Sequence, residues 1–177
     1  MSAGQGQRIR RIAFGALVGA LYATATVLVS PLSFGPLLQF RFAEALCLLP
    51  FFAPETVPGL FVGCLIANLF SPFGLPDIIV GSCATLLAVF LVSKIKISWL
   101  TPLPVVVCNA LMVGAVLSLY SEEHIPYVIA VAWVGLGELA VCVLLGLPLL
   151  VALPRLPYFR QLFPRAQRYI DAHKRVE

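Results

Sequence analysis

Residues 39–52 read QFRFAEALCLLPFF, and this stretch places an arginine and a glutamate inside a long apolar part of the chain. Arg41 and Glu44 lie three positions apart, and apolar runs flank them on both sides. In an apolar segment that spans a membrane, a charged side chain at the bilayer centre costs about 2.5–3.5 kcal/mol on insertion scales. Charges that are kept at such a place therefore indicate a function or an internal pair.

The composition of the whole chain is that of an integral membrane protein. Of its 177 residues, 60% are hydrophobic and only 11% are charged, and the mean hydropathy is +0.99. Soluble domains contain about 45–50% apolar and about 25% charged residues. The net charge is +4, but the basic residues gather at the chain ends and in one loop. This distribution does not favour a nucleic-acid partner.

The apolar residues form six segments, which predicts an all-α protein with six transmembrane helices. About 20 apolar residues are needed to cross a bilayer core of roughly 30 Å. The breaks between segments are rich in proline, glycine and serine, as helix ends are. The first apolar run is about as long as a full span, which argues against a cleaved signal peptide. The predicted spans are 12–31, 37–53, 56–71, 77–93, 100–120 and 125–153.

The basic residues predict the orientation of these spans, because cytoplasmic loops carry an excess of lysine and arginine. With six spans, eleven of the twelve basic residues fall on one side, and only Arg41 falls on the other. Both termini are therefore expected in the cytoplasm. The sequence divides into a basic N-terminus (1–11), a membrane domain (12–153) and a basic tail (154–177), which we expect along the inner headgroups.

Seven polar side chains fall inside the predicted spans, and each has a structural as well as a functional interpretation. Arg41 and Glu44 can neutralise each other at i, i+3 spacing. Asp77 can interact favourably with the helix dipole at the start of a helix, and Asn68 and Asn109 can bridge helices. Ionisable groups within a membrane favour a function by default. The seven candidates for a binding site are Gln39, Arg41, Glu44, Asn68, Asp77, Asn109 and Glu138.

Glu138 is the candidate with the weakest structural explanation. It lies near the middle of the last predicted span, in WVGLGELAV, with no basic residue close by in the sequence. A buried carboxylate without a partner either takes up a proton or meets a cation. We therefore expect Glu138 to bind a ligand or to act in gating.

Catalytic chemistry is not indicated. The two histidines lie in a loop and in the tail, and the sequence contains no HExxH, nucleophile-elbow or P-loop motif. Five cysteines without a CxxC pair favour small buried residues over a disulfide framework or a zinc site. We predict no catalytic residue, metal or cofactor, and a binding site that is reached from the acidic outer side.

The first span contains a stripe of small residues in AFGALVGALYAT. Gly15 and Gly19 are four residues apart, and Ala16 and Ala20 lie beside them. Small residues at this spacing let another helix approach closely in lipid. The partner helix can belong to this chain or to another protein.

Two stretches, SPLSFGPLLQFRFAEALCLLPFF and PGLFVGCLIANLFSPFGLPDIIVGS, resemble the QueT family. Its members are substrate-binding S components of energy-coupling factor (ECF) transporters for queuosine precursors. The similarity runs from about Arg11 to the end of the sixth span. It implies a six-helix bundle in a prokaryotic cell membrane, with a ligand site near the outer face capped by the loop between the first two helices.

The resemblance also implies partners and a ligand. The partners are a membrane T component, which would dock on Gly15, Ala16, Gly19 and Ala20, and two ATPase subunits. The ligand would be a 7-deazaguanine such as the aminomethyl precursor of queuosine, or queuine.

Carboxylates suit the N–H donors and the cationic amine of such a ligand. Glu44 and Glu138 are the expected acceptors, and Gln39 and Asn68 are the orienting amides. Arg41 either keeps Glu44 ionised or binds the ring carbonyl. The aromatic residues that can stack on the ring are Phe34, Phe40 and Trp133.

Three other functions stay open at the level of the sequence. An S component can carry another vitamin, such as cobalamin, which would need a wider and less acidic cavity. A membrane-embedded enzyme acting on lipid would show turnover without a partner. A purely structural subunit would bind no small molecule.

Overall fold

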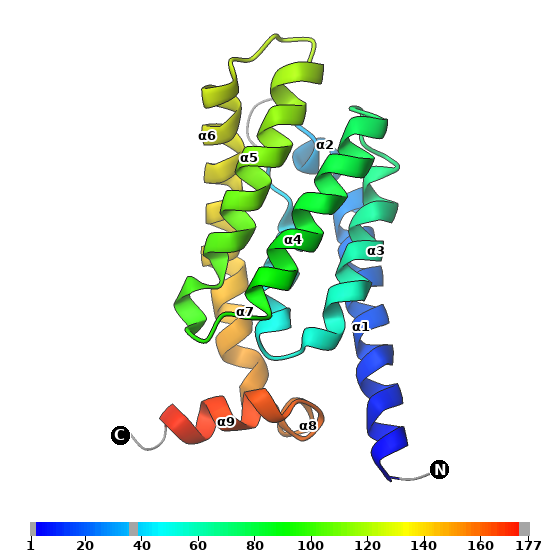
Figure 1. The fold of residues 1–177 in the computed structure, drawn as a ribbon, viewed down its shortest axis with the longest axis vertical. Helices are drawn as coiled ribbons and strands as arrows, with labels where there is room; N and C mark the ends of the chain where they lie inside the picture. Colours follow the sequence, from blue (N-terminus) through cyan, green and yellow to red (C-terminus); the bar gives the residue numbers. More distant parts are fainter. Residues whose placement is uncertain (1–2, 36–38, 174–177) are drawn as a thin grey trace.

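Every regular element in residues 3–35 and 39–173, the part of the chain that the computed structural model describes, is helical (Figure 1). The α-helices are α1 (Ala3–Leu28), α2 (Ser30–Ser33), α3 (Val57–Asn68), α4 (Ser82–Val92), α5 (Pro102–Tyr120), α6 (Tyr127–Val141), α7 (Leu147–Ala152), α8 (Pro157–Leu162) and α9 (Pro164–His173). The 3-10 segments are η1 (Phe42–Phe51), η2 (Pro54–Thr56), η4 (Ser98–Leu100) and η6 (Leu153–Arg155), and the π segments are η3 (Asp77–Gly81) and η5 (Cys142–Gly146).

The long elements run antiparallel along one axis (Figure 1). The chain ascends α1, returns through η1 in the middle of the bundle, ascends α3, descends α4, ascends α5 and descends through α6 and α7. The start of α1 and helices α8 and α9 lie at the same end of the bundle. The loops that follow α1, α3 and α5 lie at the opposite end.

Three helices are long and apolar enough to cross a membrane, namely Gly4–Leu28, Ser98–Tyr120 and Tyr127–Arg155. Two shorter apolar helices, Phe42–Phe51 and Asp77–Val92, lie beside them. Many large apolar side chains on these helices are exposed, whereas polar ones such as Arg41, Glu44 and Glu138 are buried. Exposed apolar helix surfaces together with buried charged side chains are suited to lipid, and these features are those of a multi-pass membrane protein.

Residues 39–52 do not form the α-helix that was predicted over residues 37–53. Residues 37 and 38 lie outside the described part of the chain, and Gln39 to Arg41 are not helical. A 3-10 helix follows from Phe42 to Phe51 and contains Pro50. The 3-10 helix rises about 2.0 Å per residue, so ten residues extend about 20 Å, more than an α-helix of the same length would. The segment is buried on nearly all sides, as a central element must be.

The other predicted spans correspond to helices with slightly different bounds. Helix α1 starts at Ala3 and so includes most of the predicted N-terminal segment 1–11. The last predicted span, 125–153, is divided by the π segment η5 into α6 and α7. The fourth predicted span, 77–93, begins with the π segment η3.

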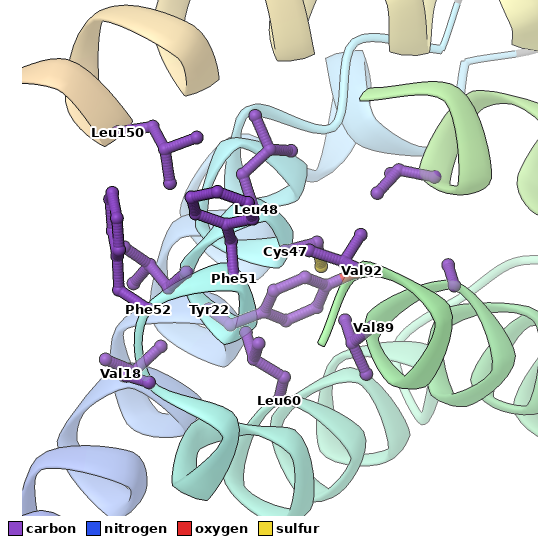
Figure 2. Packing of buried hydrophobic residues seen from close by; sticks show 14 of the residues in the cluster. Val18, Tyr22, Cys47, Leu48, Phe51, Phe52, Leu60, Val89, Val92 and Leu150 are labelled. Carbon is purple, nitrogen blue, oxygen red and sulfur yellow. The ribbon is translucent and has the colours of Figure 1, made fainter. Parts of the chain in front are cut away.

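The main hydrophobic core surrounds η1. Figure 2 shows the Tyr22 ring of α1 among Cys47, Leu60, Val89 and Val92, which come from η1, α3 and α4. A second, smaller cluster joins α4, α5 and α6 through residues such as Val113 and Val134. Four of the cysteines are buried as expected, but Cys83 is exposed, and all five are free.

Helices α1 and α3 cross at glycines. A Cβ added to Gly19, Gly59 or Gly63 would overlap the backbone of the facing helix, and one at Gly15 would lie 2.6 Å from the carbonyl oxygen of Glu55. Small residues permit such an approach in lipid, where packing rather than the hydrophobic effect drives helix association.

Helices α8 and α9 lie across the end of the bundle (Figure 1). Phe159, Leu162 and Phe163 belong to the main core, and the ring of Phe163 lies 5.1 Å from that of Phe14 in α1. Arg11 Nε donates to the carbonyl oxygen of Leu162 at 2.7 Å. Helices α8 and α9 are thus packed against the end of the bundle, and the location of the tail along the inner headgroups stays a prediction.

Candidate functional site

Arg41 is the largest fully buried side chain in the described part of the chain. Only 2% of it is exposed. Its Nη2 forms an ion pair with Asp77 Oδ2 at 3.1 Å, and its Nε donates to the carbonyl oxygen of Ser33 at 3.3 Å. The guanidinium also lies 4.9 Å from the ring centre of Phe34. Arg41 therefore connects the segment after α1 to the start of η3.

The predicted Arg41–Glu44 pair is replaced by this Arg41–Asp77 pair. Arg41 precedes the 3-10 helix and has φ −84° and ψ 84°, so it is not helical. An i, i+3 pair requires helical backbone at both residues. Without it, the Arg41 side chain reaches a different helix.

Asn68 and Asp77 bring the end of α3 and the start of η3 together. Asn68 Nδ2 donates to the carbonyl oxygen of Asp77 at 3.1 Å and lies 3.3 Å from Ser82 Oγ. A Cβ at Gly81 would lie only 2.8 Å from Asp77 Oδ1 and 2.9 Å from Asn68 Nδ2. Gly81 thus leaves room for both polar side chains. Asp77 is in the first turn of its helix, as predicted.

Glu44 is fully buried and accepts a hydrogen bond from the hydroxyl of Tyr22. Tyr22 comes from α1 and is itself fully buried. Tyr22 is not among the site residues predicted from the sequence. A tyrosine in an apolar span usually finds a partner for its hydroxyl, and this was the signal that could have found it.

Glu138 lies on α6 and pairs with Asn109 of α5, whose Nδ2 donates to Glu138 Oε1 at 3.2 Å. The preceding residue, Gly137, packs against the backbone of Gln39, because a Cβ there would overlap the Gln39 carbonyl oxygen. This contact between Gly137 and Gln39 holds the non-helical segment before η1 against α6. Glu138 also lies within electrostatic range of Glu44 and Arg41.

The side chains of the site keep polar atoms that bind nothing in the described part of the chain. Each such buried group costs about 1–3 kcal/mol when it lacks a hydrogen bond. Seven of these atoms belong to six of the predicted site residues, and we call them the open polar atoms. They are Gln39 Nε2 and Oε1, Glu44 Oε2, Asn68 Oδ1, Asp77 Oδ1, Asn109 Oδ1 and Glu138 Oε2.

The open polar atoms come from η1 and its preceding segment, α3, η3, α5 and α6. Electrostatic contacts join the groups further, since Arg41 interacts with both Asp77 and Glu44, and Glu44 with Glu138. One carboxyl group, that of Asp77, contacts the Arg41 guanidinium, and those of Glu44 and Glu138 interact with it only at longer range. The described residues contain no group of histidine, cysteine, aspartate and glutamate side chains that could hold a metal ion.

The three aromatic candidates differ in position. Phe34 is buried and lies against the Arg41 guanidinium. Phe40 is half-buried, and its backbone N–H donates to the carbonyl oxygen of Leu32 at 2.9 Å. Trp133 packs against the second hydrophobic cluster. Of these three candidates, Phe34 is therefore the one in direct contact with the polar residues of the site.

The four predicted docking residues divide into two faces of α1. Gly15 and Gly19 are buried against α3, whereas Ala16 and Ala20 are exposed. All four line a groove of about 420 Å³ between α1 and α3, together with residues such as Pro58 and Val62. The intramolecular and the outward-facing interpretations of the stripe therefore apply to different residues.

Comparison with known proteins identifies the family. The family model described as QueT transporter matches residues 12–155, which includes α1 from Ile12 and every site residue named above. No curated protein and no solved structure matches the chain. The match covers most of the chain, and the chain therefore belongs to the QueT transporter family.

Proposed function

We propose that the protein is the substrate-binding S component of an ECF transporter and captures a cationic 7-deazaguanine precursor of queuosine. The observation that carries this proposal is the set of buried open polar atoms on five parts of a bundle that belongs to a transporter family. Buried polar groups are normally hydrogen-bonded. A polar ligand that pairs with them would explain why they are kept in an apolar protein.

The charge of the site supports a cationic ligand. Asp77 is paired with Arg41, whereas the other two carboxyl groups of the site, Glu44 and Glu138, have no cationic partner at salt-bridge distance among the described residues. Two carboxylates close together in a low-dielectric interior repel each other, and a ligand ammonium group would relieve this repulsion. The aminomethyl form of the precursor provides such a group.

The remaining open polar atoms fit the edge of a guanine-like ring. Such an edge offers N–H donors and one carbonyl acceptor. Asn68 Oδ1 and Asn109 Oδ1 are acceptors for the donors, and Gln39 Nε2 is a donor for the carbonyl. A site built from paired polar groups rejects analogues that lack one of them. Phe34 is the proposed stacking partner.

The proposed topology has six membrane spans, with both termini and helices α8 and α9 in the cytoplasm. The basic residues at that end support this orientation. The ligand would enter from the opposite end, where Ser33, Phe34 and Arg41 lie next to the loop that follows α1. The location is the plasma membrane of a prokaryotic cell.

Transport requires partners in this proposal. The sequence contains no P-loop for ATP, so a T component and two ATPase subunits would supply the energy. We propose that the T component docks on the exposed Ala16 and Ala20, in the groove between α1 and α3.

Mass spectrometry of the protein purified in mild detergent tests the proposed ligand. Protein from cells that make queuosine precursors should carry a 7-deazaguanine in a 1:1 complex. The purified protein should also bind the aminomethyl precursor when it is added. A protein that carries another compound, or that binds no 7-deazaguanine, contradicts the proposal.

A further inference from the structure

A cavity of about 770 Å³ lies at the basic end of the bundle and shares no lining residue with the site described above. It is formed by the loop between α4 and α5, the end of η1 and helix α9. The loop residues 93–99 line one side, and Arg165 and Arg168 line the other. The open polar atoms do not belong to it.

The charge of this cavity has a single sign. Its lining contains four cationic residues, Lys94, Lys96, Arg165 and Arg168, and among the described residues that line it none is acidic. Like charges held around one cavity repel each other unless an anion lies between them. Arginine forks in particular match phosphate oxygens.

Helix α9, which carries Arg165 and Arg168, is held against the rest of the bundle by two contacts. Arg165 Nη1 donates to the carbonyl oxygen of Ser93 at 2.9 Å, which fastens α9 to the end of α4. The rings of Phe52 and Tyr169 lie 5.3 Å apart and join α9 to the end of η1. The cavity is therefore part of the packed structure rather than a gap beside a loose tail.

The lining also includes exposed apolar side chains. Trp99 is 68% exposed and Ile97 is 48% exposed, and both line the cavity. Phe90 and Leu91, on the neighbouring turn of α4, are exposed as well. Tryptophan is enriched where the membrane meets water. A cationic cavity bordered by lipid-facing side chains fits an amphiphilic anion better than a soluble one.

We propose that this cavity binds the headgroup of an anionic phospholipid, with its acyl chains along the exposed apolar face of α4. Basic pockets between helices on the cytoplasmic side of membrane proteins bind such headgroups. The lipid would stabilise the position of α9 under the bundle. This inference is independent of the ligand in the proposed transport site.

Fluorescence of Trp99 tests the proposal directly. The chain has two tryptophans, so a Trp133→Phe variant leaves Trp99 as the reporter. The variant is reconstituted in phosphatidylcholine vesicles that contain either brominated phosphatidylglycerol or brominated phosphatidylcholine, whose bromine atoms quench a neighbouring tryptophan. We expect stronger quenching by phosphatidylglycerol at equal mole fraction. Lys96→Gln with Arg168→Gln should lower the relative affinity for phosphatidylglycerol on the order of tenfold, because each basic residue near the surface contributes to anionic-lipid binding.

Arg8→Gln with Arg10→Gln provides the matched control, since it removes two exposed cations from the same end but outside the cavity. This control should keep its preference for phosphatidylglycerol. Equal quenching by both lipids, or equal loss in the control, would overturn the proposal. So would competition by inorganic phosphate at millimolar concentration, which would identify a free-anion site. Native mass spectrometry of the unsubstituted protein provides a second test, because it should retain phosphatidylglycerol in preference to phosphatidylcholine.

Discussion

At the level of single residues, the Arg41–Asp77 pair joins the segment after α1 to the start of η3. Both side chains are almost completely buried, and the two groups are 3.1 Å apart. A buried ion pair contributes little compared with an apolar pair, but removing one partner leaves an uncompensated buried charge. The pair therefore makes the bundle sensitive to single substitutions at either position.

We predict that Asp77→Asn lowers the free energy of unfolding by about 3–5 kcal/mol, since Arg41 would lose its counter-charge. Thermal unfolding in detergent measures the change. Adding Arg41→Gln to Asp77→Asn should recover part of the loss, because no unpaired charge would then be buried. Glu123→Gln, in an exposed loop, provides the control. The pair has no structural role if Asp77→Asn and the control unfold alike.

We also predict an effect for Tyr22→Phe, which removes the hydrogen-bond donor to Glu44. The loss should be about 1–3 kcal/mol of unfolding free energy, the cost of leaving a buried acceptor unpaired. Tyr120→Phe, at an exposed tyrosine on α5, should have little effect in the same unfolding assay. An unchanged stability of the Tyr22 variant would contradict the proposed role of this hydroxyl.

The sequence predicted which polar side chains lie buried in the apolar segments but not their partners. A polar group in an apolar span is visible without a structure, and six of the seven predicted residues carry open polar atoms. Tyr22 was missed because a tyrosine ring is as compatible with an apolar span as it is with a polar site. The partner of Arg41 was mistaken because the pairing argument assumed a helix at a residue whose backbone is not helical.

At the scale of elements, apolar segment length predicted most of the helices and failed at residues 37–53. Length and composition indicate that a segment is buried, but they do not separate α from 3-10 geometry. The signal was Pro50, which cannot donate an N–H to the helix, together with the all-round burial that only tertiary packing reveals. The π segments at Asp77 and Cys142 had no recognisable sequence pattern.

The small-residue stripe of α1 yields a prediction about assembly. Leucine at Ala16 and Ala20 adds bulk to exposed positions in the groove between α1 and α3. The isolated variant should fold and bind its precursor with near-normal affinity. Copurification with the T component and ATP-dependent uptake should both fall at least tenfold. A tenfold loss of affinity corresponds to about 1.4 kcal/mol.

The matched control for that prediction is Ala132→Leu, the same substitution at an exposed position of α6. It should keep both ligand binding and assembly. Loss of ligand binding with the T component still attached would show that the stripe serves the bundle rather than a partner.

At the scale of the whole molecule, the basic residues predict which end faces the cytoplasm. The structure places the start of α1 and helices α8 and α9 at one end and the loop containing Glu123 at the other (Figure 1). Ile95→Cys and Glu123→Cys are introduced separately into a chain without its native cysteines. An impermeant thiol reagent should label the two positions differently. From outside intact cells, position 123 should react and position 95 should not. The reverse pattern would overturn the proposed orientation.

Calorimetry on Glu44→Gln and Glu138→Gln tests whether the buried carboxylates hold a cationic 7-deazaguanine. Each substitution should weaken binding of the aminomethyl precursor by about 2–5 kcal/mol, the usual cost of removing one partner of a buried charged contact. The neutral cyano precursor should lose less at the carboxylate that faces the amine, and Glu122→Gln in the exposed loop should bind normally. If both carboxylate variants bind the aminomethyl precursor as tightly as the unsubstituted protein does, the account of the site is wrong.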